Sequence, residues 1–384
     1  MKRIYLDHAA TTPVDLEVRK AMKPFLSDNF GNASSLHSFG RDAKQALEES
    51  RGKIAEKLGA GPDEVVFTSG GTESNNLALK GVAFANRKKG KHIITSKIEH
   101  DCVLNSCKWL ENEGFEVEYL DVGREGFVNL EVLGNSIRKD TVLVSIIHGN
   151  NEVGTIQNLK EIGKICSERD VYFHTDACQS FTKVPLDVGK HNLDLVTINS
   201  HKIYGPKGVG ALFVRKGTRI IPWQHGGGHE FNKRGGTENI PAIVGFAKAT
   251  EVTGEKEIQH MTGLRDRLIA GIPGEFPDSW LNGPKENRLC NNANFSFRHI
   301  EGESIVLRMD QKGIAVSTGS ACSSHSLEPS HVMIAIGLKP EEAHGSVRIT
   351  VGKENTMEEI EFAIESLREV TDGLRKMSPF VKNV

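Results

Sequence analysis

Short apolar runs alternate with helix-like stretches over the first part of the chain. From Val65 to about residue 215 these runs are VVFT, HIIT, FEVEYL, TVLVSII, VYFH, LVTI and ALFV. Short, continuously apolar runs between helices are typical of strands that are buried on both faces of a parallel sheet. The pattern predicts an α/β fold with a mainly parallel sheet, and ligands of such sheets bind beyond the carboxyl ends of the strands.

The end of one helix can be placed from the same pattern. Residues 41–58 carry Ala43, Leu47 and Ile54 at helical spacing. Gly59 follows, and glycine readily adopts the left-handed conformation that closes a helix. We therefore predict a helix that ends before Gly59.

The alternation stops in the last third of the chain. A long helical stretch, isolated strands at ANFSF and SVRITV, and a closing helix with Thr356 and Glu359 in the capping-box arrangement follow there. A chain of 384 residues is long enough for two hydrophobic cores. We expect a large domain over residues 15–250 and a small α+β domain made of residues 1–14 and 251–384.

Composition and charge exclude several classes of protein. Hydrophobic residues make up 38% and charged residues 26% of the chain, and the formal net charge is -2 at pH 7. These values are typical of a globular protein and provide no strong positive field for nucleic acid or an anionic membrane. No long apolar run precedes Asp7, so we expect neither a signal peptide nor a membrane span, and we expect a cytoplasmic location.

The chain has 6 cysteines and no C-x-x-C pair, which argues against a zinc ribbon and against a disulfide framework. Cys322 differs from the others, because it lies in STGSACSSHSLEPSHVM with little hydrophobic cover. A nucleophilic thiol needs such access, whereas a Ser-rich surface loop with an incidental cysteine is the alternative. The remaining cysteines are interpreted as small buried side chains: Cys102, Cys107, Cys166, Cys178 and Cys290.

A glycine-rich turn joins the first predicted strand to a helix. The stretch VVFTSGGTESNN places Gly70, Gly71 and Thr72 at this junction. Backbone amides at the positive end of a helix can bind a phosphate group. A turn of the same sequence that binds no ligand is the alternative.

Two charged residues follow other predicted strands. Asp176 after VYFH is either a helix N-cap or a counter-charge that keeps a pyridine nitrogen protonated. Lys202 after LVTI could form a Schiff base with an aldehyde. A carboxylate, an amine and a phosphate-binding turn at equivalent strand ends together favour a cofactor site. Lys207, the competitor of Lys202, lies within a Gly-Pro-Lys-Gly turn and is interpreted as structural.

Three further positions have weaker signals. His100 follows a strand and could stack on a flat cofactor and transfer protons, or it could be a capping or core histidine. Arg348 in SVRITV could bind a carboxylate through two parallel hydrogen bonds, or it could form an ordinary surface ion pair. His225 and His229 lie on a glycine loop without a matching carboxylate, so we predict no metal site.

Taken together, these motifs resemble the cysteine desulfurases of the iron-sulfur-cluster and nitrogenase type, a group of class-V aminotransferases with the aspartate-aminotransferase-like fold type I of pyridoxal-phosphate enzymes. The resemblance spans nearly the whole chain. It implies a mainly parallel seven-stranded sheet in a large domain, a smaller α+β C-terminal domain and a homodimer. The matching motifs are YLDHAATTPVD, GNASSLHSFGR, GGTESNN, IEH, NNEVGTIQ, HTDACQ, SHKIYGPKG, GGGHEFNKRGGTEN, GSACSSHSLEPS and SVRITVG.

For the cofactor, pyridoxal 5'-phosphate, the resemblance implies that Lys202 carries it covalently, His100 stacks on its ring and Asp176 pairs with its pyridine nitrogen. Gln179 would contact the ring hydroxyl. The phosphate would be held by Gly71, Thr72 and His201, with Thr237 reaching it from the other subunit, and Asn151 completes the set of cofactor-binding residues.

For the reaction, the resemblance implies that Asn151 and Arg348 bind L-cysteine, Arg348 through the carboxylate. Lys202 and His100 would be catalytic groups for proton transfer, and Cys322 would receive the sulfur as a persulfide while alanine leaves. An acceptor protein such as an iron-sulfur scaffold would take the sulfur from Cys322. No metal, nucleic acid or membrane is implied.

The chain departs from the usual family pattern at a few positions. Asn199 stands where a phosphate-binding serine is usual, and His8 and Asn232 also differ. Another pyridoxal-phosphate reaction, such as transamination or selenocysteine cleavage, would use Lys202 but would not require Cys322. A scaffold protein without turnover is the alternative of another class, and the set of Lys202, Asp176 and Cys322 argues against it.

Overall fold

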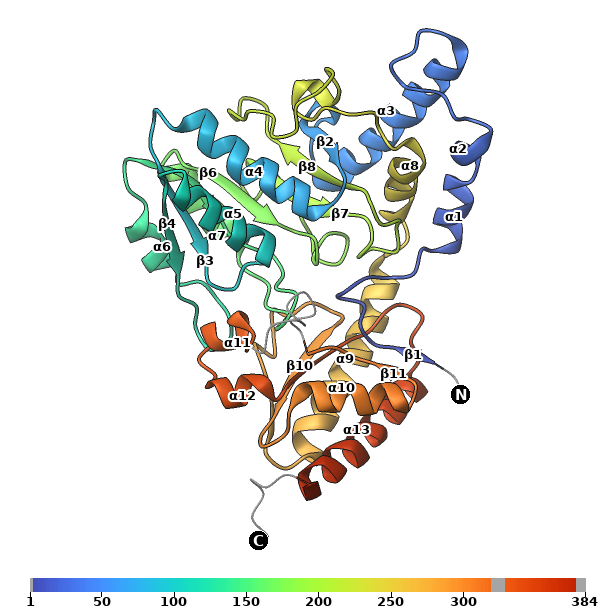
Figure 1. Cartoon of the computed structure of the whole chain (residues 1–384), viewed down its shortest axis with the longest axis vertical. Helices are drawn as coiled ribbons and strands as arrows, with labels where there is room; N and C mark the ends of the chain where they lie inside the picture. The colour runs from blue at the N-terminus through green and yellow to red at the C-terminus, as the bar shows by residue number, and fades with distance from the viewer. Residues whose placement is uncertain (1–2, 319–328, 378–384) are drawn as a thin grey trace.

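The computed structural model describes residues 3–318 and 329–377 and contains a mixed seven-stranded sheet in the order β2-β8-β7-β6-β5-β3-β4 (Figure 1). The strands from β7 through β6, β5 and β3 to β4 run parallel, whereas β8 is antiparallel to both of its neighbours. The predicted, mainly parallel seven-stranded sheet is confirmed. Its strands are β2 (Val65–Thr68), β3 (His92–Ser96), β4 (Glu116–Leu120), β5 (Thr141–Ser145), β6 (Tyr172–Asp176), β7 (Leu195–Asn199) and β8 (Gly210–Val214).

Helices cover both faces of this sheet (Figure 1). Val66 and Ile93 pack on one face with residues of α4 and α5, whereas the adjacent Phe67 and Ile94 pack on the other face with residues of α3, α7 and α8. Burial of both faces explains why the strand runs in the sequence are continuously apolar. The helices of this domain are α1 (Leu16–Met22), α2 (Pro24–Ser27), α3 (Ser38–Leu58), α4 (Gly71–Asn86), α5 (Asp101–Asn112), α6 (Leu130–Ser136), α7 (Leu159–Glu168) and α8 (Ile240–Ala249), with short 3-10 turns η1 (Pro62–Glu64) and η2 (Glu230–Asn232).

The helix predicted over residues 41–58 ends where expected but begins earlier. Gly59 has a left-handed backbone with φ 69° and caps the C-terminus of α3. At the other end, the Nδ1 atom of His37 accepts a hydrogen bond from the backbone of Gly40. Histidine is not among the preferred N-cap residues, which is why the sequence pattern missed the first turn.

The small domain has its own hydrophobic core, formed by α9, α10 and α13 against the antiparallel sheet β12-β10-β9. The predicted capping box of α13 is confirmed, because Thr356 and Glu359 exchange hydrogen bonds of 3.3 Å between backbone nitrogens and side-chain oxygens. The elements are α9 (Glu255–Glu275), β9 (Ser279–Leu281), β10 (Asn292–Phe297), α10 (Gly302–Gln311), β11 (Ile314–Ala315), α11 (His331–Ala335), α12 (Pro340–His344), β12 (Ser346–Thr350) and α13 (Met357–Met377).

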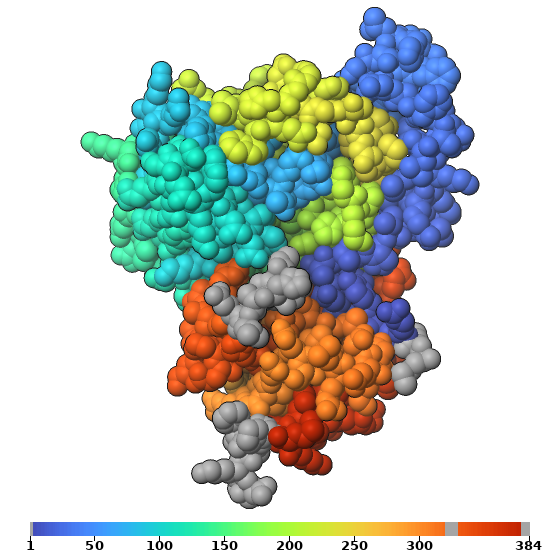
Figure 2. Space-filling model, in the orientation of Figure 1, coloured from blue at the N-terminus to red at the C-terminus, as the bar shows by residue number. Residues whose placement is uncertain are grey.

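The N-terminal segment belongs structurally to the far end of the chain. Strand β1 (Ile4–Tyr5) pairs in parallel with β11, and Asp7 forms a bridge with Thr350 of β12. Figure 2 shows this blue segment at the junction with the orange small domain. It therefore brings residues 7–12 to the boundary between the two sheets, where the candidate site lies.

A separate apolar cluster joins the two domains. Ile98 after β3 and Ile147 after β5 pack against Val332, Met333 and other residues of α11 and its neighbourhood. The cluster places the start of α11 beside the carboxyl ends of the large sheet. Among the residues that the structure describes, no helix combines the length and apolar character needed to cross a membrane.

Candidate active site

Three predicted site residues lie directly after, or at the end of, strands of the large sheet. Asp176 is the last residue of β6, Lys202 follows β7, and Gly71 begins α4 after β2. Strands β6 and β7 are parallel neighbours, so their carboxyl ends meet at the same edge. This is the edge at which open α/β sheets bind ligands.

Asp176 is buried, and its carboxylate accepts two hydrogen bonds. The backbone nitrogen of Cys178 donates to Oδ1 over 2.9 Å, and Nδ2 of Asn75 donates to Oδ2 over 2.6 Å. Residues 178–183 form turns and no helix directly follows Asp176, so the alternative of a helix N-cap is wrong.

A cavity of about 470 Å³ lies at the start of α4. A Cβ atom at Gly71 would stand 2.6 Å from the sulfur of Cys178, so only glycine fits there without a shift. The amides at the N-terminus of this helix provide a positive end for an anion. Lys207, which we interpreted as structural, also lines the cavity, together with Ala10, Thr11, Ser69, Gly70, Gly71, Thr72, Glu73, His201, Gly208 and Val209.

His201 and Gln179 are both tied to the N-terminal segment. Nδ1 of His201 lies 3.2 Å from the hydroxyl of Thr11, and Nε2 of Gln179 donates to the carbonyl of Ala9 over 2.9 Å. Burial, followed by the charges of Lys202 and of other nearby lysines, lowers the pKa of His201 to about 4. His201 is therefore a neutral ring at physiological pH.

His100 is the N-cap of α5 and also lies near Lys202. Its Nδ1 atom accepts a hydrogen bond from the backbone nitrogen of Cys102 over 3.2 Å and lies 3.1 Å from the sulfur of the same residue. Burial lowers the pKa of His100, and the charge of Lys202 acts in the same direction. The capping alternative is thus correct for Nδ1, and it leaves the other side of the ring for a second function.

Arg348 of β12 is buried and holds two partners at the junction of the domains. Nη1 donates to the carbonyl of Asn151 over 3.0 Å, and Nη2 donates to Oδ1 of Asp7 over 2.8 Å. The residue is only 2% exposed, so the alternative of an ordinary surface ion pair is wrong. The structure thus brings Arg348 and Asn151 together.

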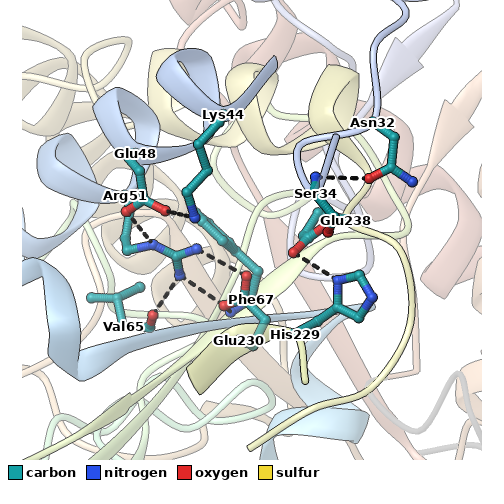
Figure 3. A network of polar contacts seen from close by, with 10 residues as sticks. All are labelled: Asn32, Ser34, Lys44, Glu48, Arg51, Val65, Phe67, His229, Glu230 and Glu238. Atoms are coloured by element: carbon teal, nitrogen blue, oxygen red, sulfur yellow. Dashed lines mark hydrogen bonds and ion pairs between the residues drawn. The ribbon is translucent and has the colours of Figure 1, made fainter. Parts of the chain in front are cut away.

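Thr237 is exposed and does not line the cavity, so the structure does not bring it to the other predicted residues within one subunit. The preceding turn is firmly anchored (Figure 3). Glu230 accepts two hydrogen bonds from the guanidinium of Arg51, at 2.7 and 2.9 Å, and one from the backbone nitrogen of Phe67. The anchor holds three consecutive positive φ angles, at Glu230, Phe231 and Asn232.

Cys322 lies outside the described residues, but both sides of its segment are described. Ser317 exchanges backbone hydrogen bonds of 2.6 and 3.1 Å with Arg348. On the other side, the hydroxyl of Ser330 donates to Glu152 over 2.6 Å, next to Asn151. One flank of the Cys322 segment is therefore hydrogen-bonded to Arg348, and the other to the residue that follows Asn151.

The sequence analysis missed two residues of this site. Asn75 contacts Asp176, and Asp7 contacts Arg348. Both stand in motifs that were recognised, GGTESNN and YLDHAATTPVD, but nothing in the sequence indicated their partners. Across the described part of the chain, no group of three or more His, Cys, Asp and Glu side chains could hold a metal ion.

Comparison with known proteins defines the family. The model of the family "Aminotransferase class-V" matches residues 4–362. The chain therefore belongs to the class-V aminotransferases. It is 55% identical to "Cysteine desulfurase IscS" of Dictyoglomus turgidum over 99% of this chain and 98% of the relative, and 53% identical to the protein of the same name from Methanosarcina thermophila over 98% and 94%.

Solved structures agree with this assignment. A "NIFS-LIKE PROTEIN" superposes with a TM-score of 0.91 at 38% identity and covers 97% of this chain and 100% of its own. "SspA in complex with cysteine" superposes with a TM-score of 0.83 at 40% identity, over 92% and 100%. Within the class-V aminotransferases, the chain belongs to the pyridoxal-phosphate-dependent cysteine desulfurases.

The candidate site fits pyridoxal phosphate. The cavity at α4 has the backbone amides of a helix N-terminus that a phosphate requires, and the buried carboxylate of Asp176, oriented by two hydrogen-bond donors, is an acceptor for a protonated pyridine nitrogen. Asn199, which replaces the usual serine, is buried with its Nδ2 atom 3.5 Å from a Cβ built on Gly71, and its Oδ1 accepts no hydrogen bond from the described residues. A polar group of the cofactor can therefore serve as its partner.

Proposed function

We propose that this chain removes sulfur from L-cysteine with pyridoxal phosphate held on Lys202, and that Cys322 receives the sulfur and passes it to an acceptor protein. The arrangement of Lys202, Asp176 and the phosphate cavity at neighbouring strand ends is the observation that carries the proposal. The cysteine desulfurase relatives support the reaction, and "SspA in complex with cysteine" supports the substrate.

Different residues of the chain would bind different parts of the cofactor. Gly71, Thr72 and His201 would hold the phosphate, with Thr237 of the partner subunit, and Asp176 would hold the protonated pyridine nitrogen. Gln179 and Asn151 would contact the ring and its substituents, and His100 would stack on the ring. When bound, pyridoxal phosphate supplies a sink for the electrons released at the α carbon of an amino acid.

Arg348 would orient the substrate through its carboxylate. The guanidinium is buried and already held by Asn151 and Asp7, so little side-chain entropy remains to be lost on binding. With the carboxylate fixed there, the α carbon would face the amine of Lys202. Lys202 would take the α proton and later return a proton to carbon.

The transfer of sulfur to Cys322 requires no further oxidant or reductant. The thiolate of Cys322 attacks the substrate sulfur, a bond forms between the two sulfur atoms, and the bond between sulfur and the β carbon breaks with its electrons on carbon. A proton is added to that carbon, and alanine leaves. The persulfide on Cys322 is then attacked by a thiol of the acceptor, for which an iron-sulfur scaffold protein is our first candidate.

We also propose the domain division, the oligomeric state and the location of the protein. The two hydrophobic cores support a division into residues 15–250 and residues 1–14 with 251–384. A homodimer would bring Thr237 to the phosphate of the other subunit. We propose the cytoplasm as the location, because the 6 cysteines give no sign of a disulfide framework.

The proposal is tested by following alanine and protein persulfide after cysteine is added to wild type, Cys322→Ser and Lys202→Ala. Cys322→Ser should keep the cofactor but lose persulfide and nearly all alanine, and Lys202→Ala should lose both products and the absorption of the lysine-bound cofactor. Cys166→Ala, at a buried thiol of α7, is the matched control and should behave as wild type. Equal rates in Cys322→Ser and wild type, or release of pyruvate with an aminated cofactor, would contradict the proposal.

A further inference from the structure

The hydrogen bonds around His100 determine which of its ring nitrogens carries the proton. A backbone N–H is always a donor, so the contact from Cys102 N to Nδ1 requires a lone pair on Nδ1. The neutral ring then has its proton on Nε2. The opposite tautomer would place two hydrogens against each other along this contact.

The side chain of Cys102 also favours a lone pair on Nδ1 of His100. Its sulfur lies 3.1 Å from Nδ1 of His100 and accepts a hydrogen bond from Nδ2 of Asn75 over 3.0 Å. Burial, followed by the charge of Asp176, raises the pKa of Cys102 to about 12, so the thiol keeps its hydrogen. With Asn75 as donor to the sulfur, the S–H can point only toward the ring nitrogen as a second donor.

Asn75 has one possible orientation in this arrangement. Its Nδ2 atom also donates to Oδ2 of Asp176 over 2.6 Å. The two hydrogens of this amide are therefore shared between Asp176 and Cys102. A continuous series of hydrogen bonds runs from the carboxylate through the amide and the thiol to Nδ1 of His100.

The position of the ring at the start of a helix strengthens the effect. His100 caps α5, a helix of 12 residues, whose N-terminus disfavours a positive charge. Protonation would have to occur at Nδ1 and would break both accepted hydrogen bonds. The neutral ring with Nε2–H is thus the form that the surroundings stabilise, and Nε2 makes no hydrogen bond to the described residues.

We propose that Asn75 and Cys102 are positioning residues that fix His100 as the Nε2–H tautomer, so that Nε2, and not Nδ1, can donate a hydrogen bond to a bound cofactor or substrate. This inference rests on the proposed function, because it assumes the proposed active site, and it adds which nitrogen of the His100 ring carries the proton.

The test is the nitrogen chemical shifts of the His100 ring in protein labelled with nitrogen-15 histidine, recorded at pH 8. His100→Gln assigns the resonances, because it removes one pair. In wild type, without substrate, Nδ1 should resonate as a bare nitrogen and Nε2 as an N–H. An Nδ1–H ring, or an even mixture of both tautomers, would overturn the proposal. No turnover is measured, so the result is independent of whether the chain desulfurates cysteine.

Two variants at Cys102 separate the effect of its backbone N–H from the effect of its thiol. Cys102→Pro removes both the backbone N–H and the thiol in the first turn of α5, where proline is tolerated, and should produce a mixture of tautomers. Cys102→Ala keeps the backbone donor and should keep the Nε2–H form, with a smaller shift of Nδ1. An unchanged spectrum in Cys102→Pro would contradict the proposal. If that variant does not fold, the wild-type spectrum and Cys102→Ala decide.

Discussion

Arg348 donates from Nη2 to Oδ1 of Asp7 over 2.8 Å, so the guanidinium that we propose for substrate binding already has a carboxylate partner. Asp7 comes from the N-terminal segment and Arg348 from β12. A substrate carboxylate that binds this guanidinium would therefore compete with Asp7 for the same cation. We expect the buried ion pair to hold Arg348 in place in the empty site and to weaken substrate binding.

Replacing Asp7 by asparagine should separate these two effects. Asp7→Asn removes the charge of this partner of the guanidinium, and a hydrogen bond to a charged group contributes about 1.5–3 kcal/mol. We expect a lower KM for cysteine, by about threefold or more, and a lower melting temperature. Steady-state kinetics and thermal unfolding measure both. Asp121→Asn, which breaks the exposed pair with Lys97, is the control and should change neither. A higher KM would mean that Asp7 only positions Arg348.

The pair of Arg51 and Glu230 should dominate the stability of the loop that carries Thr237. Both side chains are almost fully buried, so Arg51→Met leaves an uncompensated carboxylate and should lower the free energy of unfolding by about 3–5 kcal/mol. Urea unfolding measures this change. The double variant Arg51→Met, Glu230→Met removes both charges and should recover a large part of the loss. A loss in the double variant equal to the sum of the losses in Arg51→Met and in Glu230→Met alone would show that the charges are not coupled.

Glu99 should make stability depend on pH. Burial raises the pKa of Glu99 from 4.5 to about 8, so between these values the folded protein holds a proton that the unfolded chain has released. Stability therefore falls as pH rises through this window, by at most about 1.4 kcal/mol per pH unit. Relative to Glu99→Gln, which cannot titrate, wild type should lose stability between pH 5 and 8. Parallel stability profiles of the two proteins would contradict the expected shift.

Thr182 is a strained position. Its φ angle is +65°, where a β-branched residue is rare, and its buried hydroxyl has no partner among the described residues. We expect Thr182→Gly to stabilise the protein by about 1 kcal/mol, because glycine relieves left-handed strain of about 1–2 kcal/mol. Thr182→Ala removes the same hydroxyl but keeps a Cβ atom and should stabilise less. Urea unfolding compares the three proteins, and equal stability of the glycine and alanine variants would argue against backbone strain.

The large sheet could be predicted because its signal is local. Each buried strand is a continuous apolar run, so VVFT and LVTI correspond directly to β2 and to most of β7. The antiparallel direction of β8 could not be predicted, since direction depends on how the chain crosses over the sheet. Strand β9 (Ser279–Leu281) was missed, because three half-buried residues at a sheet edge leave no periodic pattern.

Site residues could be predicted from the sequence where the residue type allows only a few chemical roles. Asp176 and Lys202 stand at strand ends, where a carboxylate and an amine point to a ligand. Asn75 and Asp7 could not be found in this way, because their function depends on partners about 100 and more than 300 positions away. The roles of Thr237 and Cys322 remain predictions, and the persulfide and alanine formed by Cys322→Ser test the role of the thiol.

The pairing of β1 with β11 has a consequence for synthesis of the chain. Ile4 leaves the ribosome first, but its partner Ile314 is made more than 300 residues later. At roughly 5–20 residues per second, the N-terminal strand waits about 15–60 seconds for its neighbour. The large sheet can assemble during that delay, but Asp7 cannot meet Arg348 until translation is almost complete. A nascent chain would thus have its cofactor pocket before it could orient a substrate.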